Sequence, residues 1–299
     1  MAKSYNPKVD NTVVRTGYTE IDGYQVFYRE AGSDNKAKLI LYHGFPGSSA
    51  YYRNIMATLA DTFHVIAPDF LGFGNSDKPD PAKYAYSFDD TARMMAAFQE
   101  KMGFTRTAMY LQDYGGPVGF RIIEQHPEWL EWLIIQNTNA FEEGFTEVWN
   151  GLRGAYWLNK TPETEEPLRG FLQPDTVKTL YQHGHPDPSL VSPEAWQIDT
   201  FHLQHEYAER IQLDFFYDYR NNVSQYQSVQ AMFQKMQPKA QIFWGNGDIF
   251  FTPKGGELYL TILPDADFHW LESGHFAVED CGNYIAAEMK RFYAEQVAG

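Results

Sequence analysis

The sequence predicts an α/β fold in which helices cover both faces of a mostly parallel β-sheet, with a helical insertion in its second half. Three observations support this prediction. Short apolar runs alternate with segments of helical spacing up to residue 136. The same alternation resumes near residue 240. Between them, residues 141–225 combine helical patches, many aromatic residues and proline-rich joints, and they contain no clear strand.

The first part of the chain supplies most of the predicted sheet. Residues 13–20 and 24–30 are expected to form a hairpin that turns at Asp22-Gly23. Ser87 is a helix N-cap candidate, because acidic residues occupy the first turn after it. The remaining strands are predicted at 38–42, 63–67, 106–112 and 130–136, and the helices at 49–60, 87–102 and 116–126.

The second part completes this core. A strand at 240–244, a helix from Lys254, a strand at 267–270 and a final helix from His275 continue the pattern. Residues 1–140 and 226–299 therefore form the predicted core, and residues 141–225 the predicted cap, or lid. Open α/β sheets bind ligands beyond the carboxyl ends of their strands, so the cap is expected to cover that edge.

Composition excludes several classes of function. The 299 residues carry 24 Lys and Arg against 39 Asp and Glu, a net charge of −15, which disfavours nucleic acid, anionic lipid and anionic substrates. No apolar run is long enough for a membrane helix, and the polar start shows no secretory signal. The single cysteine, Cys281, fits a reducing compartment. A cytoplasmic protein acting on a small neutral apolar molecule is expected.

Two motifs at predicted strand ends suggest a nucleophile and its oxyanion hole. Residues 111–116 read Leu-Gln-Asp-Tyr-Gly-Gly between a strand and a helix, the context of a nucleophile elbow, with Asp113 at the exposed position. Residues 43–47 read His-Gly-Phe-Pro-Gly after an earlier strand. In this architecture, the backbone N–H groups of Phe45 and Tyr114 would form an oxyanion hole.

Two later motifs supply an acid and a base. Asp248 ends the segment Trp-Gly-Asn-Gly-Asp after a late strand, and His275 lies in Ser-Gly-His-Phe between the last strand and the last helix. The order nucleophile, acid, histidine is that of a hydrolase triad. We therefore predict Asp113, Asp248 and His275 as the catalytic residues.

Together with residues 22–32 and 67–77, these motifs resemble the α/β-hydrolase superfamily. Within it, they resemble the aspartate-nucleophile branch of epoxide hydrolases and haloalkane dehalogenases. The resemblance covers most of the chain and implies an α/β-hydrolase fold with a cap domain. A carboxylate nucleophile can displace a leaving group at saturated carbon and form an alkyl ester, which His275 hydrolyses by activating water. This scheme needs water and no metal or organic cofactor.

The leaving group separates the possible activities. The resemblance implies two cap tyrosines for an epoxide, and Tyr219 and Tyr156 are the candidates. A halide would need N–H donors, which Tyr114 and Phe45 lack in their side chains, although Trp157 could supply one. Epoxide hydrolase is therefore the first prediction and haloalkane dehalogenase the alternative, with another activity of the same branch also open. Trp157 and Tyr217 are expected to contact substrate.

Two further interpretations belong to other classes of function. An α/β-hydrolase-fold receptor that binds ligand without catalysis would usually lack a triad residue, and here all three are present. A zinc site could be formed by histidines and one glutamate of the cap: His183, His185, His202, His205 and Glu206. No cysteine lies near them, so no metal site is predicted. The chain is expected to be a monomer or a homodimer.

Overall fold

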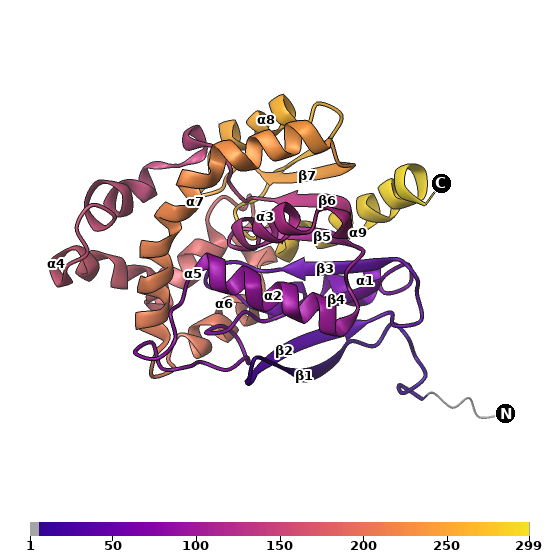
Figure 1. Cartoon of the computed structure of the whole chain (residues 1–299), viewed down its shortest axis with the longest axis horizontal. Coiled ribbons are helices and arrows are strands. Elements are labelled where there is room, and N and C mark those ends of the chain that lie inside the picture. The colour runs from indigo at the N-terminus through magenta and orange to yellow at the C-terminus, as the bar shows by residue number, and fades with distance from the viewer. Residues whose placement is uncertain (1–5, 299) are drawn as a thin grey trace.

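The computed structural model describes residues 6–298 and contains one eight-stranded sheet (Figure 1). Its strand order is β1-β2-β4-β3-β5-β6-β7-β8. The strands are β1 (Arg15–Ile21), β2 (Tyr24–Ala31), β3 (Lys38–Tyr42), β4 (His64–Pro68), β5 (Thr107–Gln112), β6 (Leu130–Gln136), β7 (Ala240–Gly245) and β8 (Asp267–Leu271). The predicted mostly parallel sheet is confirmed.

Pairing follows the expected pattern. β1 and β2 form the predicted antiparallel hairpin, and both Asp22 and Gly23 have positive φ angles, 51° and 85°, as a tight hairpin turn requires. β2 also pairs antiparallel with β4, and the pairings from β4 through β8 are parallel. The carboxyl ends of β3, β5, β6, β7 and β8 therefore share one edge of the sheet.

Helices cover both faces of the sheet. Figure 1 shows α2 and α3 in front of it, whereas α1 and α9 pack together on the other face. The core helices are α1 (Ile55–Leu59), α2 (Phe88–Met102), α3 (Gly115–Gln125), α8 (Pro253–Ile262) and α9 (Val278–Phe292). Every residue of β5 and β7 is buried, as expected for parallel strands covered on both sides.

Two predicted helices differ from the structure. The helix expected at 49–60 divides into a 3₁₀ turn, Ser49–Tyr52, and the short α1. The hydroxyl groups of Tyr51 and Tyr52 bond Gln136 and the carbonyl of Tyr42, and these bonds hold the 3₁₀ turn against the sheet. The last helix begins at Val278, because residues 272–277 form the loop that presents His275.

The insertion between β6 and β7 is helical and lies beyond the strand ends, at the left in Figure 1. It contains α4 (Pro162–Glu165), α5 (Pro174–Gln182), α6 (Pro193–His202) and α7 (Ala208–Met236), with 3₁₀ and π turns at Glu142–Gly144, Glu147–Trp149, Leu152–Tyr156, Glu166–Leu172 and Pro188–Leu190. α7 has 29 residues and runs without a break through residue 225, the boundary expected from sequence. Neither α7 nor any other described helix carries a stretch apolar enough to cross a bilayer.

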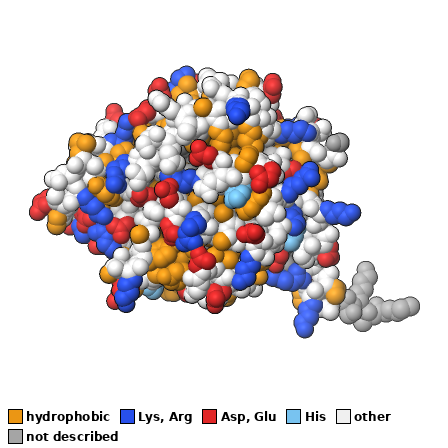
Figure 2. Space-filling model, viewed as in Figure 1, with side chains coloured by type: hydrophobic (Ala, Val, Ile, Leu, Met, Phe, Trp, Pro, Cys, Tyr) orange, Lys and Arg blue, Asp and Glu red, His pale blue; other side chains and the backbone are white. Residues whose placement is uncertain are grey.

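Acidic and basic side chains are interspersed on the face shown in Figure 2, so the excess negative charge does not form a single patch there. Most carboxylates are on the surface, but Asp199 of α6 is only 2% exposed. It accepts a hydrogen bond from Tyr181 of α5. Burial raises the pKa of Asp199 to about 7, and the charge of Glu279 acts in the same direction. The insertion therefore carries a buried carboxyl group whose pKa lies close to 7.

Asp199 should make stability depend on pH. Its folded-state pKa of about 7 exceeds the ordinary value of 3.8, so the folded state keeps a proton that the unfolded chain releases first. The group therefore stabilises the fold at low pH and loses this contribution as pH rises from about 4 to 7, by at most about 4 kcal/mol. We expect Asp199→Asn to gain stability relative to wild type between pH 5 and pH 8 in urea unfolding. A difference that is constant with pH would contradict this assignment.

Candidate active site

Asp113 lies at the turn between β5 and α3, at the carboxyl edge of the sheet. Its φ angle is 47°, a left-handed conformation that is unfavourable for a residue with a side chain. The hydroxyl of Thr138 donates to the Asp113 carbonyl at 2.7 Å and helps to hold this conformation. The sharp turn keeps the carboxylate clear of the helix, as in a nucleophile elbow.

Backbone N–H groups bind the Asp113 carboxylate. The N–H of Phe45 donates to Oδ1 at 2.7 Å, and the N–H of Tyr114 also contributes. A Cβ on Gly44 would lie 2.3 Å from the Cβ of Asp113, so only glycine permits this close approach. Burial raises the pKa of Asp113 to about 6, although the charge of His275 and both N–H groups act in the opposite direction.

His275 and Asp248 lie beside Asp113 in the arrangement expected of a base and its acid. Nδ1 of His275 lies 2.8 Å from Oδ2 of Asp248, and Nε2 lies 3.8 Å from Oδ2 of Asp113. Burial lowers the pKa of His275, but the charge and hydrogen bond of Asp248 outweigh burial and, with Asp113, raise it above the ordinary value. All three predicted triad residues are thus brought together.

Gln112 makes a contact that the sequence did not indicate. Its Nε2 lies 3.0 Å from Nε2 of His275. With the ring proton on Nδ1 donating to Asp248, Nε2 accepts from the Gln112 amide. The position of Gln112 next to Asp113 in the chain was visible in the sequence, but its partner depends on how β5 and the loop after β8 meet.

Asn137 is a second polar residue whose role sequence reasoning missed. It follows β6 with a φ of 42°, and its Nδ2 donates to Oδ2 of Asp248 at 2.7 Å. Its Oδ1 accepts the N–H of Gly245 at 2.8 Å, and the N–H of Phe250 donates to the other oxygen of Asp248 at 2.7 Å. In the sequence, Asn137 directly follows a predicted strand, a position at which functional residues are common. Because it is not a carboxylate, it did not suggest a catalytic acid.

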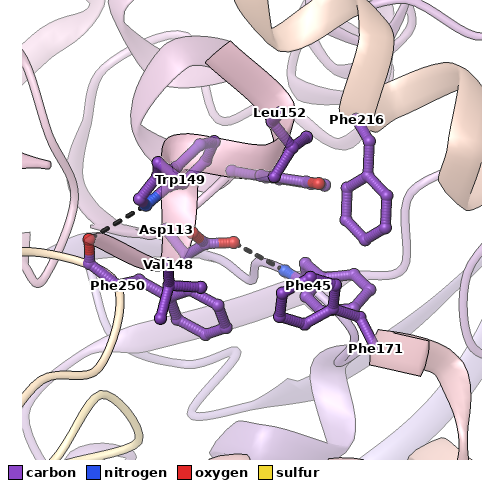
Figure 3. Close-up of a pocket in the computed structure, with 9 residues that line it drawn as sticks. Phe45, Asp113, Val148, Trp149, Leu152, Phe171, Phe216 and Phe250 are labelled. Atoms are coloured by element: carbon purple, nitrogen blue, oxygen red, sulfur yellow. Dashed lines mark hydrogen bonds between the residues drawn. The ribbon is translucent and has the colours of Figure 1, made fainter. Parts of the chain in front are cut away.

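A small cavity opens on Asp113 (Figure 3). Apolar and aromatic side chains form nearly all of its wall, and they come from the core loops and from the helical insertion. The lining residues are Phe45, Asp113, Tyr114, Val148, Trp149, Leu152, Phe171, Phe216 and Phe250. Asp113 is the one ionisable carboxyl group among them, and Tyr114 carries the one hydroxyl. Such a wall suits a small neutral molecule.

The side chains predicted in the cap lie outside this lining. The hydroxyl of Tyr156 is 3.0 Å from both Oε1 of Glu165 and the Leu213 carbonyl. The indole N–H of Trp157 donates to the carbonyl of Phe216 at 2.7 Å.

Tyr217 and Tyr219 have different surroundings. The ring of Tyr217 is covered by Lys160 and Arg220. Tyr219 is fully buried behind Trp149, with ring centroids 4.5 Å apart, and its hydroxyl lies near the hydroxyl of Tyr226.

The cap histidines and Glu206 do not converge on a metal site. Within residues 6–298, the one group of ligand atoms close enough to hold an ion is Asp267, His269 and Glu288. Arg291 already bridges Asp267 at 2.6 Å and Glu288 at 2.7 Å, so a protein cation occupies that acidic group.

A family model described as the alpha/beta hydrolase fold matches residues 38–280. The chain therefore belongs to the α/β-hydrolase family, as its motifs predicted. An uncharacterized hydrolase of Saccharomyces cerevisiae is 34% identical over 92% of this chain and 95% of that protein. The cis-3-alkyl-4-alkyloxetan-2-one decarboxylase of Shewanella oneidensis is 28% identical over 86% of this chain and 82% of its own length.

Two further similarities are more local or more distant. A haloalkane dehalogenase of Bradyrhizobium diazoefficiens is 37% identical, but over 38% of this chain and 36% of that protein. The solved structure of epoxide hydrolase CorEH without ligand superposes with a TM-score of 0.75 at 20% identity, covering 94% of this chain and 99% of its own. At that identity the structure shows the shared fold alone.

Asn137 should contribute to stability far more than a surface asparagine. Asn137→Ala leaves the Gly245 N–H without its partner, removes one of the two hydrogen bonds to Oδ2 of Asp248 and places alanine at a positive φ, so we expect a loss of about 2–4 kcal/mol. Asn221→Ala, at an exposed position of α7, should change stability by less than about 0.5 kcal/mol. Chemical denaturation of both variants measures the difference, and equal effects would show that the Asn137 contacts are not needed for stability.

Proposed function

We propose that this chain is a hydrolase that attacks a saturated carbon with Asp113 and passes through a covalent alkyl ester. The observation that carries the proposal is the position of Asp113, as the one carboxylate in an apolar cavity. Its Oδ1 is held by the N–H of Phe45, and its Oδ2 is near the His275 imidazole. Apolar surroundings strip water from the carboxylate and make it a stronger nucleophile. A hydrogen-bonded Oδ1 leaves Oδ2 free to attack.

Hydrolysis of the ester, the second half-reaction, uses His275 and Asp248. Neutral His275, oriented by Asp248, takes a proton from water at Nε2, and the resulting hydroxide adds to the ester carbonyl carbon of Asp113. The N–H groups of Phe45 and Tyr114 stabilise the oxyanion, and one such donor typically contributes about 3–4 kcal/mol. Collapse of the intermediate expels the alkoxide, which takes the proton held by His275 and leaves as the alcohol. The carboxyl group of Asp113 then loses its own proton, to solvent or to the phenolate left by epoxide opening, and the carboxylate is restored. The Gln112 amide must first release Nε2 of His275, because in the structure it occupies the place where this water has to bind.

Among leaving groups, an epoxide oxygen fits the cavity better than a halide. A halide needs free N–H donors, but the indole of Trp149 already donates to the carbonyl of Phe250 (Figure 3). The indole of Trp157 likewise donates to the carbonyl of Phe216. An epoxide needs a hydroxyl donor. Burial and then the charge of Asp113 raise the pKa of Tyr114 well above its ordinary value, so this phenol stays protonated in the cavity. Epoxide hydrolase, giving a vicinal diol, is therefore our first proposal.

Tyr219 is the second candidate donor. It lies one layer behind the cavity wall, against Trp149 and Tyr114, and its hydroxyl lies near that of Tyr226. Its hydroxyl would reach a bound epoxide only if the Trp149 indole released the Phe250 carbonyl and turned aside. Tyr156 would not, because its hydroxyl is committed to Glu165 and the Leu213 carbonyl.

A strained lactone is a second candidate substrate class, favoured by one observation. The Shewanella relative, named for its action on an oxetanone, resembles this chain over most of both lengths, whereas the dehalogenase resembles about a third. Attack of the Asp113 carboxylate on the saturated ring carbon bonded to the ring oxygen would open the lactone, and the leaving group would be the lactone's own carboxylate. Such a leaving group is stable without a proton donor, in keeping with a wall of so few polar groups.

Trapping the ester tests the proposal. In His275→Gln, alkylation by Asp113 should proceed while hydrolysis stops, so intact mass spectrometry should show a stable adduct. An epoxide adds its whole mass, whereas a haloalkane adds its mass less that of the hydrogen halide, so the mass also identifies the substrate class. The matched control, His275→Gln with Asp113→Ala, should carry no adduct. An adduct on the control, or turnover by Asp113→Ala alone, would rule out Asp113 as the nucleophile.

Removing one phenol at a time tests the leaving-group assignment. Tyr114→Phe and Tyr219→Phe each delete a hydroxyl and keep the ring. We expect the variant that lacks the donor to lose about 10²-fold or more in alkylation by epoxides, by the usual scale of acid–base catalysis, and little with haloalkanes. Tyr156→Phe serves as the control, because its hydroxyl points away from the cavity. Wild-type epoxide opening by both Tyr114→Phe and Tyr219→Phe would remove the reason for ranking epoxides first.

A further inference from the structure

Residues 183–185, His-Gly-His, form a loop of the insertion that touches both loops carrying the base and the acid. Gly184 has a φ of +79°, and a Cβ placed on it would lie 2.0 Å from the carbonyl oxygen of Gly247. A Cβ on Gly274 would lie 1.9 Å from the carbonyl oxygen of His183. Gly247 directly precedes Asp248, and Gly274 directly precedes His275. The insertion thus contacts the loops that carry Asp248 and His275 through backbone atoms.

The two core loops also contact each other at this point. A Cβ on Gly245 would lie 2.1 Å from the carbonyl oxygen of Gly274, and the N–H of Gly247 donates to the carbonyl of Ser273 at 3.0 Å. Three backbone segments therefore converge without side chains between them. A shift of one segment has to be taken up by the other two, because closely packed backbone cannot be compressed.

Side chains fasten the loop on both sides of this contact. Nδ1 of His185 lies 2.6 Å from Oδ2 of Asp280, and both side chains are almost fully buried. The other oxygen of Asp280 accepts the hydroxyl of Ser273 at 2.8 Å, two residues before His275. On the other side, Tyr181 stacks on Phe276, with ring centroids 3.8 Å apart. The residues on either side of His275 are thus tied to the insertion.

We propose that the 183–185 loop is a positioning element that sets the distance between Asp248 and His275. The inference rests on the reaction proposed above, and it assigns a role in ester hydrolysis to residues of the insertion that do not line the cavity. The 2.8 Å contact between Asp248 and Nδ1 of His275 spans the two loops that the element holds together. Alkylation by Asp113 does not use that contact, whereas activation of water does. The loop therefore affects the second half-reaction selectively.

Gly184→Ala is the direct test. Its Cβ would displace the Gly247 carbonyl and with it Asp248, and a misplacement of about 1 Å can cost about 10²-fold in rate. We expect ester hydrolysis to slow about 10- to 100-fold with alkylation within about 3-fold of wild type, so that the ester accumulates in intact mass spectra. Gly23→Ala is the strain control, because Gly23 also has a positive φ but nothing within 4 Å of its Cβ. Gly154→Ala, an uncrowded position of the insertion, controls for added bulk.

A second pair of variants keeps the test informative if Gly184→Ala does not fold. His185→Ala removes the bond to Asp280, and His185→Asn retains a donor near the position of Nδ1. Slow hydrolysis in His185→Ala, restored at least in part by His185→Asn, would support the positioning role. Equal slowing of both half-reactions in every variant, or wild-type hydrolysis in Gly184→Ala and His185→Ala, would overturn it. Absence of an ester from His275→Gln would instead overturn the proposed reaction.

Discussion

The burial of three ionisable groups at one edge of the sheet is the constraint on which the rest of the structure depends. Asp113 is 4% exposed, Asp248 7% and His275 fully buried. Charged groups removed from water are costly unless each is paired or hydrogen-bonded. The surrounding backbone supplies those bonds through the N–H groups of Phe45, Tyr114 and Phe250, and Asn137 adds its amide. The loops after the parallel strands are shaped by this requirement.

Much of the fold and the triad could be predicted because each depends on local patterns. The alternation of buried strands and helices predicted the sheet, and the strand-end motifs predicted which loops carry Asp113, Asp248 and His275. The departures have causes in tertiary contacts, which the sequence does not display. The helix expected at 49–60 divides where two tyrosine hydroxyls bond to residues of the sheet, Gln136 and the carbonyl of Tyr42.

The roles of the aromatic residues in the insertion could not be predicted from sequence, because some of them form the cavity wall and others pack elsewhere. Tyr156, Trp157 and Tyr217 are candidates by residue type, but their polar atoms or ring faces already have partners. The cavity wall includes Trp149 and Phe171, which are indistinguishable in sequence from core residues. Which aromatic side chains face Asp113 depends on how the insertion is oriented over the sheet, and no local pattern records that orientation.

The length of α7 has a consequence for how molecules reach the cavity. At about 1.5 Å per residue, its 29 residues span about 43 Å from the insertion to the end of the core segment before β7. On the C-terminal side of the insertion, this continuous helix offers no hinge. On the N-terminal side, Thr146 and Trp149 are bonded to Ile249 and Phe250 of the core. With both ends fixed, a hinged opening of the whole insertion is disfavoured. Substrate entry and product exit then depend on rotation of individual side chains of the cavity wall, such as Leu152 and Phe171. Access to Asp113 is therefore controlled by side-chain rotamers rather than by a moving domain.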